Sequence, residues 1–510
     1  MRGYAATRDA NAYLKHGVER QPTDLALLIP ALLDQVARCA RPRPCRRSAA
    51  SRAAQTSGIR RVTNEHVTNR LDDGQRRFGW MVDGDPITPA PPATLARTGQ
   101  AVELEIEWSD DPQMIYKRWF SRAAEWGDDP DKTKFRYQPP DVLWFQDTDG
   151  SVTLVGCLPQ GYNDNFATDI ARGRISVGRT IFGGPRTDYK KIHGLRSYIP
   201  GISQWLDLRS MNYEIGYAEN GRIQSLEVSL SSPEPIPLHR NLSLCARPTF
   251  RFQPPSNNDT SHIDERIVIE TTGKTLRPWS DHEALHSAVR DLIAISAWRP
   301  YNLTEIRVQR QDDPHRVLSG DAVEERWSPA ILNRMSQYPD SPKRPRFLFT
   351  FEQVRAAGVR RWIELRKKYA RGIAPILHTL GQRDIAIEIQ VAQAGIGLDG
   401  IGYQQALESG STLKVADAES HRARLKRVYR SIPANLPFSE EPWATQSADA
   451  YNAVKHANRQ VSSFEQLVEV RRMHQLLLRA WVAQKIGMRV GDLQTAVDRD
   501  PMSGPVVFYT

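Results

Sequence analysis

The pattern of apolar residues changes near Phe347, and this change constrains the fold more than any other feature of the chain. Before it, apolar runs at Val142–Phe145 and Val152–Val155 flank a turn that ends in Gly150, which is typical of a strand, a tight turn and a second strand. After it, apolar residues recur with helical spacing, most clearly over Ile385–Leu407. The sequence therefore predicts an α+β protein, in which a β-rich N-terminal domain is followed by an all-helical bundle.

The length of 510 residues is too great for a single core, so we expect several domains. Residues 1–75 are expected to be a poorly ordered extension with an Arg-rich linker. Within them, Ala37–Arg61 holds eight arginines, no acidic residue and no periodic apolar pattern, so it cannot bury enough apolar surface to fold. The β-rich domain is predicted over 76–310 and a polar linker over 311–345. A helical region is predicted over 346–500, and it contains the bundle at about 381–495.

The formal net charge of +10 comes mainly from two segments. One is the Arg-rich run, and the other is Val415–Val490, with twelve Lys and Arg against seven Asp and Glu. Clustered positive charge favours an anionic partner such as RNA. A solvated basic surface explains the charge alone equally well, so the partner has to be argued from motifs.

The remaining bulk features exclude several classes of protein. Four cysteines in a chain of this length do not make a disulfide scaffold. Cys39 and Cys45 have no histidine nearby, so we expect no zinc site there. No stretch approaches the ~20 apolar residues of a membrane span, and the N-terminus has no signal pattern. We therefore expect a cytoplasmic protein with no membrane partner and no cofactor.

A candidate site lies near the C-terminus. Ser447 is expected to cap a helix that carries Asn452 and His456. These two residues are four apart, and residues with this spacing project from one helical face. Lys455 and Arg459 flank that face, so the helix would present a histidine among positive charges.

Three segments of the β-rich half carry a family resemblance: Thr180–Gly184, Ile192–Ser197 and Gly201–Leu206. They look like the N-terminal domain of ApeA-type antiphage defence proteins. Those proteins pair a β-rich N-terminal domain with a C-terminal HEPN domain, a small helical bundle that often cuts RNA without a metal. The resemblance implies an antiphage effector that acts on RNA, forms a homodimer through its HEPN bundle and responds to a phage-encoded trigger protein.

Carried over residue by residue, the resemblance places the family's polar position at Asn452 and its histidine at His456. The family's arginine position falls on Tyr451, and an acidic position common in such bundles falls near Asp399. Metal-free cleavage needs a base, an acid and a cation beside the phosphate, and histidine can transfer protons near neutral pH. We therefore predict His456 and Asn452 as catalytic residues. Residues that could bind RNA and supply the charge are Lys455, Arg459 and Arg430.

A second motif suggests different chemistry. His282-Glu283-Ala284-Leu285-His286 has the spacing that places two histidines one helical turn apart for zinc, with Glu283 as a general base. A third ligand is missing from the motif, and the only nearby downstream candidate is Glu305, in an expected strand beyond Pro300. The sequence thus leaves three hypotheses: a metal-independent HEPN endoribonuclease, a non-catalytic HEPN sensor that binds RNA or protein, and, with least support, a zinc metallopeptidase.

Overall fold

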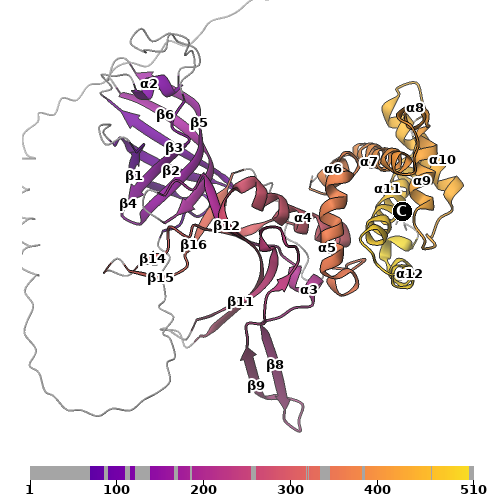
Figure 1. Cartoon of the computed structure of the whole chain (residues 1–510), viewed down its shortest axis with the longest axis horizontal. Coiled ribbons are helices and arrows are strands. Elements are labelled where there is room, and N and C mark those ends of the chain that lie inside the picture. Colours follow the sequence, from indigo (N-terminus) through magenta and orange to yellow (C-terminus); the bar gives the residue numbers. More distant parts are fainter. Residues whose placement is uncertain are drawn as a thin grey trace, which may run out of the picture. The chain divides into compact units, whose positions relative to one another are not determined.

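The computed structural model describes residues 69–84, 90–109, 115–120, 138–165, 170–183, 187–253, 260–316, 319, 321–333, 345–381, 385–460 and 462–504. The Arg-rich run predicted to be disordered, Ala37–Arg61, lies outside these residues. The described part is β-rich up to Leu332 and helical after Thr350, so the predicted α+β class is confirmed (Figure 1).

Six strands close into an antiparallel barrel: β1 (Arg76–Val82), β2 (Pro92–Thr98), β3 (Ala101–Trp108), β4 (Val142–Asp147), β5 (Gly150–Asn165) and β6 (Ile170–Phe182). The strand order is β6-β3-β2-β1-β4-β5, and β5 pairs with β6 to complete the ring. Along β3, Val102, Leu104 and Ile106 are buried and alternate with more exposed residues, because successive side chains of a strand point to opposite faces. The buried set fills the barrel.

The sheet continues beyond β6 through six further strands: β16 (Trp327–Leu332), β13 (Thr304–Gln309), β7 (Lys191–Tyr198), β12 (His262–Pro278), β11 (Cys245–Gln253) and β10 (Ile236–Pro237). The segment 311–345 was predicted to be a linker. This is wrong for β16, which pairs with β13 and β6. The sequence analysis missed it because a six-residue strand among polar and proline residues gives little periodic signal.

Two shorter pairings lie outside this sheet. One is β14 (His315–Arg316) with β15 (Ala322–Glu324), and the other is β8 (Met211–Tyr217) with β9 (Ile223–Leu230). The short helices of this half are α2 (Ile115–Phe120), α3 (Ile202–Leu206) and η1 (Asn241–Ser243). The β8–β9 hairpin projects away from β11 and α3 (Figure 1).

Helix α4 (Trp279–Ala297) joins the sheet to the helical half. The indole N–H of Trp362 donates to the Ala288 carbonyl at 2.7 Å, and the Arg479 guanidinium donates to the Ser296 carbonyl at 2.7 Å. Ala288 and Ser296 belong to α4, whereas Trp362 and Arg479 belong to the helical half. One continuous hydrophobic core therefore runs from the open sheet through α4 into the helices, and the barrel has a separate core.

The helical half contains α5 (Phe351–Lys368), α6 (Ala370–Leu380), α7 (Ile387–Glu408), α8 (Leu413–Ala418), α9 (His421–Arg430), α10 (Glu440–Lys455), α11 (Phe464–Lys485), α12 (Val490–Arg499) and η2 (Pro501–Ser503). Ser420 and Ser463 cap α9 and α11 through their hydroxyls. Helix α10 begins at Glu440, after Ser439, so the expectation that Ser447 caps it is wrong; Ser447 is buried inside the helix.

Candidate functional site at the end of helix α10

His456 lies just beyond the helix that was expected to carry it. Helix α10 ends at Lys455, and His456 has an extended backbone with φ −124° and ψ 113°. Its backbone N–H donates to the Asn452 carbonyl at 2.9 Å. The prediction that both residues lie inside one helix is therefore wrong for His456, although the two remain adjacent. The imidazole is exposed and makes no hydrogen bond with the residues that the structure describes.

Two of the predicted RNA-binding cations lie beside His456. Lys455 and Arg459 are both exposed, and neither forms an ion pair within the described part of the chain. The Lys455 ammonium lies 5.8 Å from the centroid of the Tyr451 ring. Its charge has no carboxylate partner among the described residues. The end of α10 therefore presents a histidine and two free cations to solvent.

The other cations of this region are paired within the bundle. Arg424 binds Asp399, Arg427 binds Glu419, and Arg422 and Lys426 both bind Glu441: these pairs join neighbouring helices and turns. Four cations of the basic segment Val415–Val490 are thus compensated locally. Lys455 and Arg459 differ from these residues because no described acid faces them.

Arg430 does not join the other candidates. Its guanidinium lies 2.7 Å from Glu440, in the first turn of α10, whereas His456 follows the last turn. A helix rises ~1.5 Å per residue, so the sixteen residues of α10 separate these ends by roughly 24 Å. Within one chain, Arg430 cannot contact a phosphate held at His456.

Tyr451, at the family's arginine position, packs into the bundle. Its ring stacks on His421, with centroids 4.5 Å apart. A Cβ added to Gly395 would lie 2.6 Å from its Cδ2 atom, so the ring occupies the space above that glycine. The residue is half-buried and offers no charge to a ligand.

Asp399 anchors a polar cluster beside Tyr451. It accepts hydrogen bonds from His421 Nδ1 at 3.0 Å and from Arg424 Nη1 at 2.6 Å. Burial raises the pKa of this carboxyl, but the two hydrogen bonds and the charge of Arg424 together outweigh burial and hold the pKa below its usual value. His421 and Arg424 were missed in the sequence. Their spacing of three residues on a helix capped by Ser420 was the signal that could have paired them.

The histidines of the His282–His286 motif point into the protein interior. Both rings bond to one hydroxyl, Thr271 Oγ1, at 2.8 and 2.9 Å, and His286 also bonds to Ser197 at 2.6 Å. Glu283 instead binds Arg179 at 3.1 Å. Burial lowers the pKa of His282 to about 4 and that of His286 to about 3.

These contacts do not fit a catalytic zinc ion, because three of the four ring nitrogens are used and the rings are fully buried. Among the described residues, no three His, Cys, Asp or Glu side chains are grouped so that they could hold a metal ion. The zinc-peptidase alternative is therefore not supported by the arrangement of the motif.

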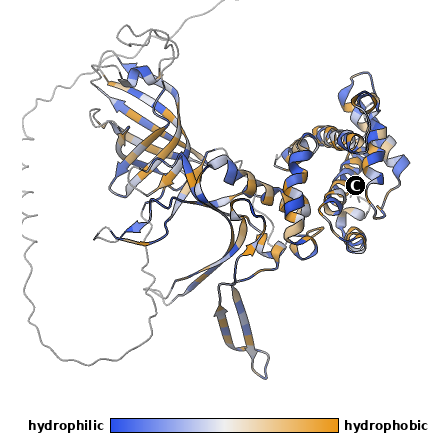
Figure 2. Cartoon of the chain, viewed as in Figure 1, coloured by the Kyte–Doolittle hydropathy of each residue, from blue (hydrophilic) through white to orange (hydrophobic). Residues whose placement is uncertain are grey.

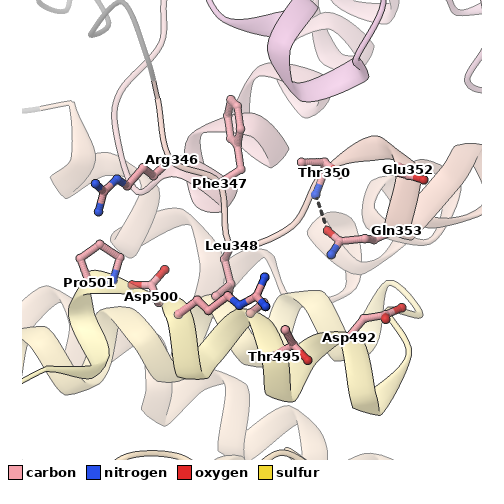
Figure 3. A pocket seen from close by; sticks show the side chains of 12 residues that line it. Arg346, Phe347, Leu348, Thr350, Glu352, Gln353, Asp492, Thr495, Asp500 and Pro501 are labelled. Atoms are coloured by element: carbon pink, nitrogen blue, oxygen red, sulfur yellow. Dashed lines mark hydrogen bonds between the residues drawn. The ribbon is translucent and has the colours of Figure 1, made fainter.

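Two of the cavities that adjoin the described helices lie near the entry to the helical half and near Asp399, and neither includes His456. One, of about 450 Å³, lies between the entry to the helical half and α12. Figure 3 shows its lining, in which the Thr350 amide donates to Gln353 at 2.8 Å. It carries charges of both signs, among them Arg346 and Asp492. The second, of about 400 Å³, adjoins Asp399. Neither is lined by a residue predicted for catalysis.

Comparison with known families identifies the two halves. Residues 100–362 match ApeA N-terminal domain 1, and residues 408–491 match the Apea-like HEPN domain. The described fold, a β-rich domain followed by a helical bundle, agrees with these matches, which define a HEPN-domain protein. The chain belongs to the ApeA family, as the three N-terminal segments indicated.

The HEPN match begins at Glu408, the last residue of α7, so Asp399 lies just before it. No curated protein and no solved structure matches this chain. Among the helices that the structure describes, none has the length and apolar composition needed to cross a membrane.

Proposed function

We propose that this protein is an antiphage defence effector that binds RNA at the exposed end of α10 and cleaves it without a metal. The observation that carries the proposal is the grouping of His456 with Lys455 and Arg459, all exposed and without ion pairs in the described part of the chain. Membership of the ApeA family supports the defence role. In this proposal the β-rich half responds to a phage-encoded trigger.

The chemistry follows from the three groups. His456 takes the proton of a ribose 2′-hydroxyl or returns one to the leaving oxygen, because an exposed imidazole can do either near neutral pH. Lys455 and Arg459 stabilise the negative charge that develops on the phosphate. Asn452, whose carbonyl already fixes the His456 backbone, orients the histidine or the phosphate.

Within the described residues, one copy supplies one histidine at this end, whereas the reaction uses both a base and an acid. A homodimer through the HEPN bundle would bring two His456 side chains to a shared cleft. It could also bring Arg430 of one copy near His456 of the other, a proximity that α10 rules out within a single chain. This dimer is part of the proposal.

The proposal is tested with the full-length protein and a fluorescent single-stranded RNA. We expect cleavage that EDTA does not inhibit, with 2′,3′-cyclic phosphate ends on the products. Arg459→Glu should weaken binding, and the slope of log affinity against log salt should fall by about 1 for the lost phosphate contact. Arg360 is a matched exposed arginine of α5. Arg360→Glu should leave the RNA affinity and its salt dependence unchanged. Equal effects of the two variants would contradict the assignment of the α10 end.

A second candidate is a non-catalytic sensor that binds RNA or protein through the same surface. It is favoured by the packing of Tyr451 against His421, because no arginine occupies the family's position and lysine is not an equal replacement for its planar cation. The two candidates differ in one outcome: the sensor binds RNA with the same dependence on Arg459 but yields no cyclic phosphate products.

A further inference from the structure

The β8–β9 hairpin has one face that is entirely apolar and one that is polar. Its cross-strand pairs place eight apolar residues on the same side, in four rungs from base to tip: Met211 with Leu230, Tyr213 with Val228, Ile215 with Leu226, and Tyr217 with Ile223. The opposite side carries Asn212 with Ser229, Glu214 with Glu227, and Gly216 with Ser225. Figure 2 shows the alternation of hydrophobic and hydrophilic residues along both strands.

The apolar face is uncovered. Tyr217, Ile223 and Leu226 are 64%, 65% and 61% exposed, and Tyr213 is 57% exposed. Neither strand packs extensively on another described element, and the pair forms a separate two-stranded sheet. The alternation of Leu226, Val228 and Leu230 with polar residues is typical of a half-buried strand. The strand is present, but no described residue covers its apolar side chains, and Leu226 and Val228 stay exposed.

A two-stranded hairpin is at best marginally stable in water unless a third strand or a packed face supports it. Among the described residues, this hairpin is held at its base, where the Met211 amide donates to Glu265 at 3.1 Å. The Ser231 amide closes the base of the hairpin by donating to the Ser210 carbonyl at 2.8 Å. The apolar face therefore requires an occupant from outside the hairpin.

We propose that the occupant is the same face of a second copy of this chain, stacked on it around a two-fold axis. The four apolar rungs, the last of which follows a register shift between Gly216 and Tyr217, can face the same rungs of a second copy, as an isologous interface requires. The polar face is unsuited to stacking, because Glu214 and Glu227 lie directly opposite each other and like charges in such pairs repel.

Charges at the two ends of the hairpin fit an antiparallel stack. Glu219 and Arg222 lie at the tip, and Asp207 and Arg209 lie at the base; all four are exposed and form no ion pair within the described part of the chain. An antiparallel stack brings the tip of one hairpin to the base of the other. Glu219 then faces Arg209 of the second copy, and Arg222 faces its Asp207.

The exposed area suits a weak two-fold contact. A large apolar side chain buries on the order of 100–200 Å², so the four most exposed residues and Val228 offer roughly 400 Å² from each copy. The total of about 800 Å² lies below the ~1,000 Å² expected of an independently stable interface. Hairpin stacking should therefore depend on concentration, or reinforce another contact between the two copies.

The test uses cysteine crosslinking in the full-length chain, with Cys39 and Cys45 replaced by serine and the buried Cys157 and Cys245 retained. Leu226→Cys lies in the middle of the apolar face, and its matched control Ser225→Cys is the adjacent residue on the polar face. Under mild oxidation, Leu226→Cys should form a disulfide-linked dimer at least about tenfold faster than the control, because neighbouring residues of a strand point to opposite faces.

Exposure of Leu226 makes it safe to substitute without loss of folding, so Leu226→Glu provides a second measurement. Its self-association constant by sedimentation should be at least about tenfold weaker than that of the parent, since a buried carboxylate without a partner is strongly disfavoured. Equal crosslinking at both positions, no crosslinking at Leu226→Cys, or unchanged self-association of Leu226→Glu would overturn the proposal. A dimer formed by the bundle alone gives these contrary results, so the two contacts are distinguishable.

Discussion

The imidazole of His421 stacks on the ring of Tyr451 with 4.5 Å between centroids and 27° between planes. Tyr451 is the residue on which the family's arginine position was expected to fall. It ties α10 to α9, and through Asp399 to α7. Tyr451 therefore has a structural role in this chain.

Replacing Tyr451 with arginine should destabilise the protein and should not raise its activity. The change removes the stacked ring pair, worth about 0.5–1.5 kcal/mol, and the packing over Gly395. We expect a lower unfolding temperature by differential scanning fluorimetry, whereas Tyr451→Phe keeps the ring and should match the parent. A stable Tyr451→Arg variant with faster RNA cleavage would show that this position faces the active cleft.

His474 should make the protein less stable in acid. It is buried in α11, both ring nitrogens lack partners among the described residues, and burial lowers its pKa to about 3. Its unfolded pKa is ~6.5, so its contribution to stability is complete above pH 6.5 and is lost as the pH falls toward 3. In this range only the unfolded chain takes up the proton. The free energy of unfolding therefore falls by about 1.4 kcal/mol for each unit by which the pH is lowered.

Urea unfolding at pH 7 and pH 5 measures this loss, which should be about 2 kcal/mol for His474 alone. His282 and His286 act in the same direction, so the comparison needs a variant. His474→Leu should be at least as stable as the parent at pH 7, because it removes two unsatisfied nitrogens. It should also lose less stability on acidification. The same pH dependence in both proteins would contradict the burial of a neutral His474.

His286 should be needed for folding and not for metal binding. His286→Ala leaves the hydroxyl of Ser197 without its histidine partner, removes one of the two histidine bonds to Thr271 and opens a cavity, which should cost about 2–4 kcal/mol. EDTA or added zinc should leave the unfolding temperature of the parent unchanged. A zinc-dependent increase that His286→Ala abolishes would restore the peptidase alternative.

Features fixed by local pattern were predicted from the sequence. The hairpin of β4 and β5 follows from two apolar runs around a turn that ends in Gly150, and α7 follows from the helical spacing over Ile385–Leu407. Closure of the barrel was not predicted, because pairing between β5 and β6 depends on register across the sheet rather than on local spacing.

The site was predicted less completely than the fold. No glycine or proline follows Lys455 closely, so nothing in the sequence indicated that α10 would end one residue before His456. Asp399, His421 and Tyr451 come from three helices, and their contact depends on tertiary packing that single-chain periodicity does not encode. Pairing of Arg430 with Glu440 across two helices was missed for the same reason.

The central claim, that His456 transfers protons in RNA cleavage, is tested most directly by the single-turnover cleavage rate of His456→Ala. The side chain is exposed and unbonded in the described structure, so the variant should keep the parent's unfolding temperature. Its rate should fall by about 10²–10⁴, the usual contribution of general acid–base catalysis, and Asn452→Ala should lose less. If His456→Ala cleaves RNA as fast as the parent, His456 is not the catalytic residue and the account of the site is wrong.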